Sequence, residues 1–170
     1  MTAFLVVLGL ASFQSNKVEA TKINPASWGA NKVYTTPKKT RGTWYYKDPD
    51  EKKVKKFKIT AHTLNGLKLY KALKGKTADK FANKLIKADK KSGYKLANKV
   101  GESMWSAYPV KWHKIAGFEA DGWLAGSGDG YFFILVKKTV KGKKVNALRI
   151  DEGYKNSFFA YGYKNKNLVK

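Results

Sequence analysis

Apolar and polar residues alternate along much of the chain, and this alternation predicts a mainly β protein. Phe57, Ile59 and Ala61 are separated by lysine and other polar residues. A period of two is typical of an antiparallel strand with one buried face. The dipeptide Asn65-Gly66 then favours a tight hairpin turn into the next strand. Further strands are predicted from alternation or short apolar runs at residues 42–47, 67–70, 112–118, 123–124, 131–136, 145–150 and 157–163.

The middle of the chain changes to a helical period. Ala78, Phe81, Ala82, Leu85 and Ile86 recur at the spacing of one helix face, which predicts a helix over roughly residues 77–91. Residues 94–104 continue the helical spacing. The expected fold class is therefore mainly β with a helical insert between two groups of strands.

Residues 1–20 are expected to be a signal peptide, with an apolar run at 3–13 and cleavage after Ala20. No lysine or arginine precedes the run, so a buried strand is the alternative. Residues 21–40 are expected to form an N-terminal arm from which Trp28 packs back onto the domain, and residues 41–170 to form one domain. No later segment is apolar enough to predict a membrane span.

Charge is the dominant feature of the composition. The chain has 35 Lys and Arg residues, of which only Arg41 and Arg149 are arginine, against 12 acidic residues, for a net charge of +23. Such a charge predicts a polyanionic partner attracted by solvated point charges rather than by bidentate contacts. There is no cysteine, which excludes thiolate metal sites and cysteine nucleophiles and suits an exported protein of a Gram-positive cell.

Few residues offer catalytic or metal chemistry. His62 and His113 are the only histidines and lack metal-ligand spacing, so neither a metal nor a cofactor is expected. Glu119 and Asp121 alternate onto one face of an extended segment, but nearby lysines keep carboxylates ionised and oppose a general-acid role. The glycine-rich loop 126–130 is followed by a strand, which favours a tight turn over a phosphate-binding loop. We therefore expect a protein that is not an enzyme.

The segment Arg41-Gly42-Thr43-Trp44-Tyr45-Tyr46 resembles the opening strand of lipocalin-like (calycin) barrels. Together with the stretch from Asp121 to the C-terminal strands, it makes the chain similar to small secreted lipocalin-like proteins of lactobacilli. The resemblance implies an antiparallel barrel or half-open barrel with an uncharacterised extracellular role. It also implies that Gly42, Trp44 and Arg149 pack at one barrel end, with Arg149 over Trp44. The helical insert departs from an eight-stranded up-and-down layout and argues against full closure of a barrel.

The aromatic residues allow three interpretations: a filled core, an apolar pocket, or a platform that stacks sugars or bases. The last strand has aromatic residues on both faces, so it is either covered on both sides or exposes an aromatic ridge. The candidate ligand-binding residues are Trp112, Trp123, Tyr131, Phe133 and Tyr161.

Two functions follow as hypotheses. The first is an exported, non-enzymatic protein that associates electrostatically with anionic cell-surface polymers such as teichoic acids. The alternative is a lipocalin-like carrier of a small apolar ligand. Specific nucleic-acid recognition is not expected because arginine is scarce, and a monomer is expected.

Overall fold

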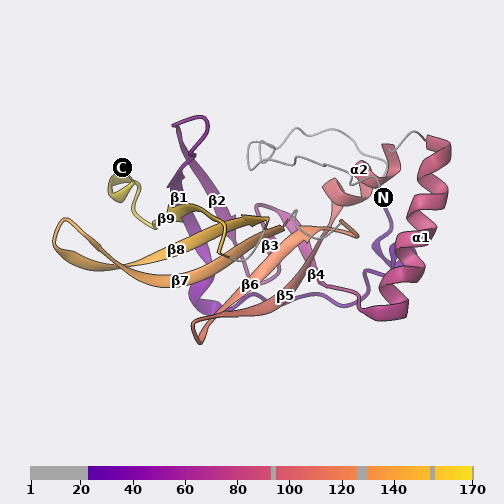
Figure 1. Cartoon of the computed structure of the whole chain (residues 1–170), viewed down its shortest axis with the longest axis horizontal. Helices are drawn as coiled ribbons and strands as arrows, with labels where there is room; N and C mark the ends of the chain where they lie inside the picture. Colours follow the sequence, from indigo (N-terminus) through magenta and orange to yellow (C-terminus); the bar gives the residue numbers. More distant parts are fainter. Residues whose placement is uncertain (1–22, 93–94, 126–129, 154–155, 170) are drawn as a thin grey trace.

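The computed structural model describes residues 23–92, 95–125, 130–153 and 156–169. The expected signal peptide, residues 1–20, and most of the glycine-rich loop, residues 126–129, lie outside this part of the chain. The described residues build a mainly β structure with two helices (Figure 1), so the mainly β class and the helical insert predicted from the sequence are confirmed.

The strands form one nine-stranded sheet in which the spatial order follows the chain order. All neighbours are antiparallel except β4 and β5, which are parallel and are joined through the two helices. The strands are β1 Gly42–Lys47, β2 Val54–Ile59, β3 Thr63–Leu64, β4 Leu67–Lys71, β5 Trp105–Trp112, β6 Ile115–Gly122, β7 Gly130–Val140, β8 Lys143–Gly153 and β9 Phe158–Gly162.

The two ends of the strand order meet at a single pair of residues. Tyr45 of β1 and Tyr163, just beyond β9, each donate an amide hydrogen bond of 2.8 Å to the other's carbonyl. Among the described residues, no ladder of more than this one pair joins β1 to β9, so the sheet is not closed into a barrel. The parallel β4–β5 pair explains the departure from an up-and-down layout, because a parallel pair needs a long crossover rather than a hairpin.

Helix α1 spans Gly75–Ser92 and covers the predicted range 77–91; α2 spans Lys95–Ser103. Asp89 of α1 is buried, and its Oδ1 accepts the amides of Leu96 and Ala97 at 2.9 and 3.2 Å. Both amides belong to the first turn of α2, where no intrahelical acceptor exists. One carboxylate therefore links the end of one helix to the start of the next.

Two hairpin turns show how far local signals reach. Asn65 and Gly66 have φ values of 50° and 91°, as the predicted turn requires. The prediction of one strand over residues 112–118 is wrong, because His113 and Lys114 (φ 44° and 67°) form the turn between β5 and β6. Neither residue is of the type that marks such turns, so the sequence carries no local signal for it.

The apolar side chains form two clusters. The main cluster contains Tyr34, Trp44, Tyr46, Phe57, Ile59, Leu64, Leu69, Trp105, Ala107, Phe118, Ala120, Tyr131, Phe133, Leu148, Ile150 and Ala160. The second cluster joins the helices and the N-terminal arm to the sheet through Trp28, Ala30, Tyr70, Leu85, Val100, Met104 and Trp123. Trp28 thus packs back onto the domain as predicted, and its carbonyl accepts the Trp123 Nε1–H at 2.8 Å.

The β1–β2 turn is organised by Asp48, which is only 5% exposed. Its Oδ1 accepts the amides of Asp50 and Glu51, both at 2.9 Å, and its Oδ2 lies 3.0 Å from Lys55 Nζ. Burial alone raises the pKa of this carboxyl, but the hydrogen bonds from the two amides and from Lys55 outweigh burial and hold the pKa below its ordinary value of 3.8.

Because the folded-state pKa of Asp48 is lowered, its ionised form stabilises the fold above pH 3.8, and this contribution is lost as pH falls through the folded-state pKa. We expect Asp48→Asn to lower the free energy of unfolding by about 1–3 kcal/mol at neutral pH. The difference from the unmodified protein should shrink in acid. Urea unfolding at neutral pH and at about pH 3 measures both effects, with the more exposed Glu51→Gln as control. A difference that is constant with pH would contradict this role of the charge.

Candidate functional site

The β7–β8 hairpin concentrates positive charge. Residues 130–150 contain no Asp or Glu, and the end of the hairpin carries five lysines. Both strands have 11 residues, against 5 in the neighbouring β9. The hairpin therefore projects beyond the rest of the sheet, at the far end from the helices (Figure 1). The five lysines of this cationic hairpin are Lys137, Lys138, Lys141, Lys143 and Lys144.

The register of the hairpin decides which side chains share a face. Phe133, Leu135, Leu148 and Ile150 point toward the main cluster. Residues between them in the sequence point to the opposite, outer face, because side chains alternate along a strand. Arg149 is one of these, opposite Ile134, and Lys138 lies further along the same face opposite Val145.

Arg149 is held between two aromatic rings on this outer face. Its guanidinium carbon lies 4.7 Å from the centroid of the Trp112 ring and 5.6 Å from that of Phe158. Its Nε donates to Oδ1 of the fully buried Asp151 at 2.6 Å. The planar guanidinium thus stacks on aromatic rings and pairs with a carboxylate at once, which an ammonium group does poorly.

Asn156 completes the hydrogen bonding around Arg149. Its amide donates to Asp151 Oδ2 at 3.0 Å, and its side-chain oxygen accepts the Trp112 Nε1–H at 2.6 Å. The end of the β5–β6 hairpin is thereby attached to the segment between β8 and β9. Trp112 is positioned by these contacts rather than by burial in a core.

A second cation and two more aromatic rings extend this surface. Lys138 Nζ lies 4.4 Å from the centroid of the Tyr161 ring, and the Tyr161 and Phe158 ring centroids are 4.7 Å apart. Phe158 is 50% exposed. The last strand therefore exposes aromatic rings, one of the two alternatives that its sequence allowed. We call this surface the cationic aromatic face; its residues are Trp112, Lys138, Arg149, Phe158 and Tyr161.

The five predicted ligand-binding residues do not form one site. Trp112 and Tyr161 lie on the cationic aromatic face, whereas Trp123 belongs to the second cluster. Tyr131 and Phe133 are buried in the main cluster, where Tyr131 stacks on Trp105 with ring centroids 6.3 Å apart. The Phe133 ring is 5.0 Å from Phe118.

The expected packing of Arg149 over Trp44 is wrong. Trp44 is fully buried in the main cluster, and Arg149 points to the other side of the sheet because its neighbours in β8 point inward. The cation over the Trp44 ring is Lys164, with Nζ 5.2 Å from the centroid. Lys164 also donates to the Arg41 carbonyl at 2.9 Å and passes close to Gly42, where a Cβ would lie 3.1 Å from Nζ. Gly42 and Trp44 thus share one packing site with Lys164.

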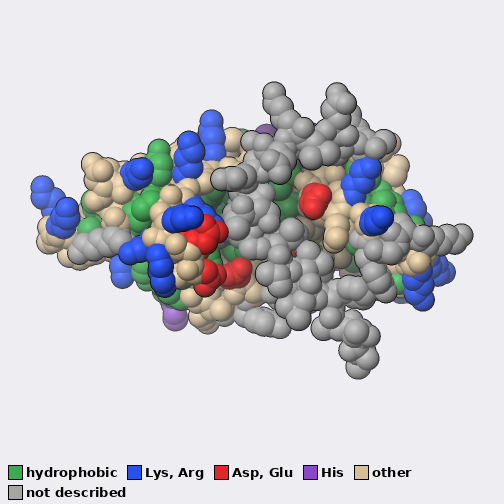
Figure 2. All heavy atoms as spheres, turned by 90° about the horizontal axis from the view of Figure 1, so that it is seen from above, with side chains coloured by type: hydrophobic (Ala, Val, Ile, Leu, Met, Phe, Trp, Pro, Cys, Tyr) green, Lys and Arg blue, Asp and Glu red, His purple; other side chains and the backbone are tan. Residues whose placement is uncertain are grey.

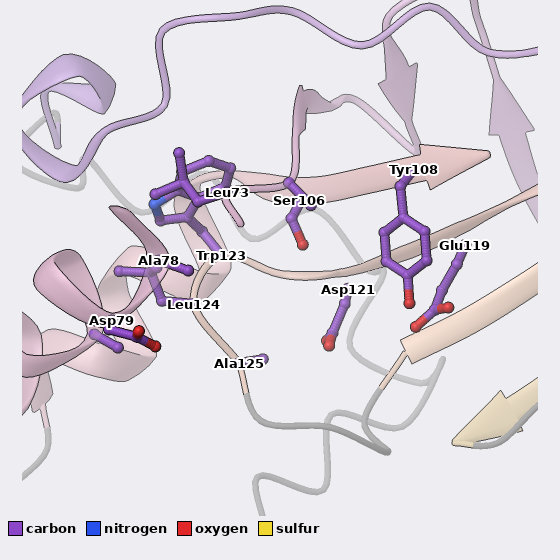
Figure 3. Close-up of a pocket in the computed structure, with 12 residues that line it drawn as sticks. Leu73, Ala78, Asp79, Ser106, Tyr108, Glu119, Asp121, Trp123, Leu124 and Ala125 are labelled. Carbon is purple, nitrogen blue, oxygen red and sulfur yellow. The ribbon is translucent and has the colours of Figure 1, made fainter. Parts of the chain in front are cut away.

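Glu119 and Asp121 share one face of β6, as predicted, and both line a cleft of about 330 Å³ next to α1 (Figure 3). The opposite wall includes Asp79 of α1. Sequence reasoning missed Asp79 because the β4–β5 crossover brings it to β6 from 40 residues earlier in the chain.

The acidic side chains contrast with the rest of the surface. Figure 2 shows lysine side chains spread over both ends of one face of the molecule, while the acidic side chains on it occupy few places.

In the described part of the chain, no group of three or more His, Asp or Glu residues is arranged to hold a metal ion. Neither described helix has the length and apolar character needed to cross a membrane.

Comparison with protein-family models, with curated proteins and with solved structures gives no match.

Proposed function

We propose that this protein is exported, is not an enzyme, and associates electrostatically with anionic cell-surface polymers of the teichoic-acid type. The observation that carries the proposal is the cationic hairpin, where five lysines project from the sheet within a 21-residue stretch free of acidic residues. A phosphate-bearing polymer that contacts this hairpin releases its condensed counterions, which favours binding at low salt.

The predominance of lysine over arginine supports binding to an anionic polymer rather than sequence-specific recognition of nucleic-acid bases. The five charges at the end of the cationic hairpin are lysine ammonium groups, which attract phosphates as point charges without the bidentate geometry used to read guanine. The one arginine nearby, Arg149, is engaged with Asp151 and two aromatic rings. Exposed lysines on α1, among them Lys76, Lys80 and Lys87, add to the attraction.

We further propose a lipocalin-like, half-open barrel for the curved sheet. The Arg-Gly-Thr-Trp-Tyr opening strand supports this relation, as does the contact between Tyr45 and Tyr163 at the two ends of the strand order. The parallel β4–β5 pair stands against a closed eight-stranded barrel. The carrier alternative needs an empty apolar interior, whereas the Phe133 ring there packs against the rings of Phe57 and Phe118. It is therefore not part of the proposal.

The test is the binding of the full chain to poly(glycerol phosphate) over a range of salt concentrations. The logarithm of the binding constant is expected to fall linearly with the logarithm of salt. Replacing the five lysines of the cationic hairpin by glutamine should weaken binding by about tenfold or more and reduce the slope.

A matched control removes the same charge elsewhere: Lys47, Lys52, Lys53, Lys56 and Lys58, all exposed on or between β1 and β2, replaced by glutamine. It should weaken binding less than the hairpin variant. Equal losses in the two variants would show that the hairpin is not the site, and binding insensitive to salt would contradict the proposal as a whole.

A further inference from the structure

The cleft beside α1 has a composition unlike the rest of the chain. Its walls come from α1, the segment between β4 and α1, β5, β6 and the turn after β6 (Figure 3). The polar residues that line it are Asp79, Ser106, Tyr108, Glu119 and Asp121. Most of the remaining lining is alanine and leucine side chains, and the volume of about 330 Å³ is that of a small-molecule site.

The charge of this lining has the opposite sign to the charge of the protein. The chain has 35 Lys and Arg residues against 12 acidic ones. Of the described residues that line the cleft, three are carboxylates and none is Lys or Arg. The cleft is therefore a negative recess in a strongly positive molecule.

Glu119 is held in the cleft wall at a cost to its ionised form. Glu119 is only 9% exposed. Burial raises the pKa of its carboxyl group, and the hydrogen bond with Tyr108, which lowers the pKa, offsets this only in part. The Tyr108 hydroxyl and the Glu119 carboxylate face one another in Figure 3. Because ionising a buried carboxylate is unfavourable without a nearby positive charge, a cation in the cleft would stabilise the ionised form.

The apolar part of the cleft lining limits which classes of ligand can bind there. Ala78, Ala82 and Ala125 have short side chains that leave room for an apolar group beside the carboxylates. A bare metal ion does not fit this lining, since no group of three described acidic or histidine residues is arranged to hold one. An anion is repelled by the three carboxylates.

We propose that the cleft binds a small organic cation, with an ammonium group at Glu119 and Asp121 and a short apolar body against the alanine and leucine side chains. This site is separate from the cationic hairpin and takes a ligand of opposite charge. Its failure would leave the proposed polymer binding untouched. A protein of net charge +23 repels cations at long range, so saturable binding of an amine requires a local site of this kind.

The experiment is an NMR titration of the full chain with 2-phenylethylammonium chloride at constant ionic strength. We expect saturable shifts of the amides of Ala78, Ser106 and Ala125, which lie in three different walls. The uncharged 2-phenylethanol should bind at least about tenfold more weakly, because a charged hydrogen bond is worth more than a neutral one.

Glu119→Gln and Asp121→Asn should each weaken amine binding by about tenfold, whereas Glu102→Gln, an exposed change on α2, should leave it unchanged. If Glu119→Gln fails to fold, Asp121→Asn tests the same prediction at the second carboxylate of the pair. The proposal is overturned if the alcohol binds as tightly as the amine, if the acidic variants bind like the unmodified protein, or if shifts are unsaturated and spread over the surface.

Discussion

Replacing Arg149 by methionine is expected to lower the free energy of unfolding by about 3–5 kcal/mol. Asp151 is fully buried, and its Oδ1 accepts from Arg149 Nε at 2.6 Å. Methionine fills part of the space between Trp112 and Phe158 but supplies no positive charge. The variant therefore leaves a buried carboxylate without its counter-ion, which costs far more than the pair itself contributes.

A double-mutant cycle separates the charge from the packing. Arg149→Met combined with Asp151→Asn should be more stable than the sum of the two single losses predicts, because the buried charge has been removed. Arg149→Lys keeps the charge but loses the stacking, so we expect an intermediate loss, larger than the approximately 0.5 kcal/mol of a surface change. Urea unfolding followed by circular dichroism measures each step. An Arg149→Met variant as stable as the unmodified protein would contradict this account.

The same position shows what the sequence is able to predict. Arg149 lies between Leu148 and Ile150, two apolar residues that strand alternation directs toward the core. Its outward direction therefore follows from the local pattern. Its partners do not, because Trp112 reaches it from the end of a different hairpin. Resemblance to a lipocalin-like strand suggested Trp44 instead, and that residue lies on the other side of the sheet.

Local sequence signals correctly predicted the elements whose structure depends on residues close together in the chain. The Asn65-Gly66 turn, the alternation in β2 and the helical period of α1 each depend on residues a few positions apart. The parallel pairing of β4 with β5 depends on segments separated by two helices, and nothing in either strand specifies the partner.

The strand β5 contains a residue that argues against a strand. Pro109 lacks a backbone donor and usually marks a break, so the sequence pattern suggested new segments after it. In the structure β4 pairs with β5 only as far as Ala107, so Pro109 lies where one side of β5 has no described ladder partner. Proline is tolerated on such an edge.

The two candidate sites also differ in whether their residues are close together or far apart in the chain. The five lysines of the cationic hairpin are visible in the sequence as a run around Lys141-Gly142, and the turn makes that run a projecting tip. The acidic cleft was only half visible: Glu119 and Asp121 are two residues apart, but Asp79 and Tyr108 join them through tertiary structure. The five lysines were not singled out from the sequence, although they are neighbours in the chain, and a site built across a crossover requires the fold.

Replacing Trp44 by alanine is expected to lower the free energy of unfolding by about 3–5 kcal/mol. The side chain is fully buried, and its Nε1–H donates to the Thr40 carbonyl at 2.7 Å. Gly162 faces it so closely that a Cβ there would lie 3.4 Å from the Trp44 Cβ. Trp44 therefore holds together β1, the turn before it and the end of β9, and alanine leaves a cavity among all three.

Two variants separate the ring from its hydrogen bond. Trp44→Phe keeps most of the apolar volume but leaves the Thr40 carbonyl without its donor, so we expect a loss of about 1–3 kcal/mol. Val54→Ala, on β2 and 44% exposed, is the control and should change stability by no more than about 0.5 kcal/mol. Circular dichroism is the suitable probe of unfolding because removing Trp44 alters the fluorescence itself.

Hydrogen exchange tests whether Trp44 fastens the two ends of the strand order to one another. The amides of Tyr45 and Tyr163 form the only described bridge between them. If Trp44 holds this contact, the free energy of opening measured at both amides in Trp44→Ala should be lower than that measured at the amides of the β7–β8 ladder. Uniform loss of protection would instead mean that Trp44 stabilises the whole sheet equally. Preferential opening at Tyr45 and Tyr163 would support the half-open barrel, because only a curved sheet brings its first and last strands to one tryptophan.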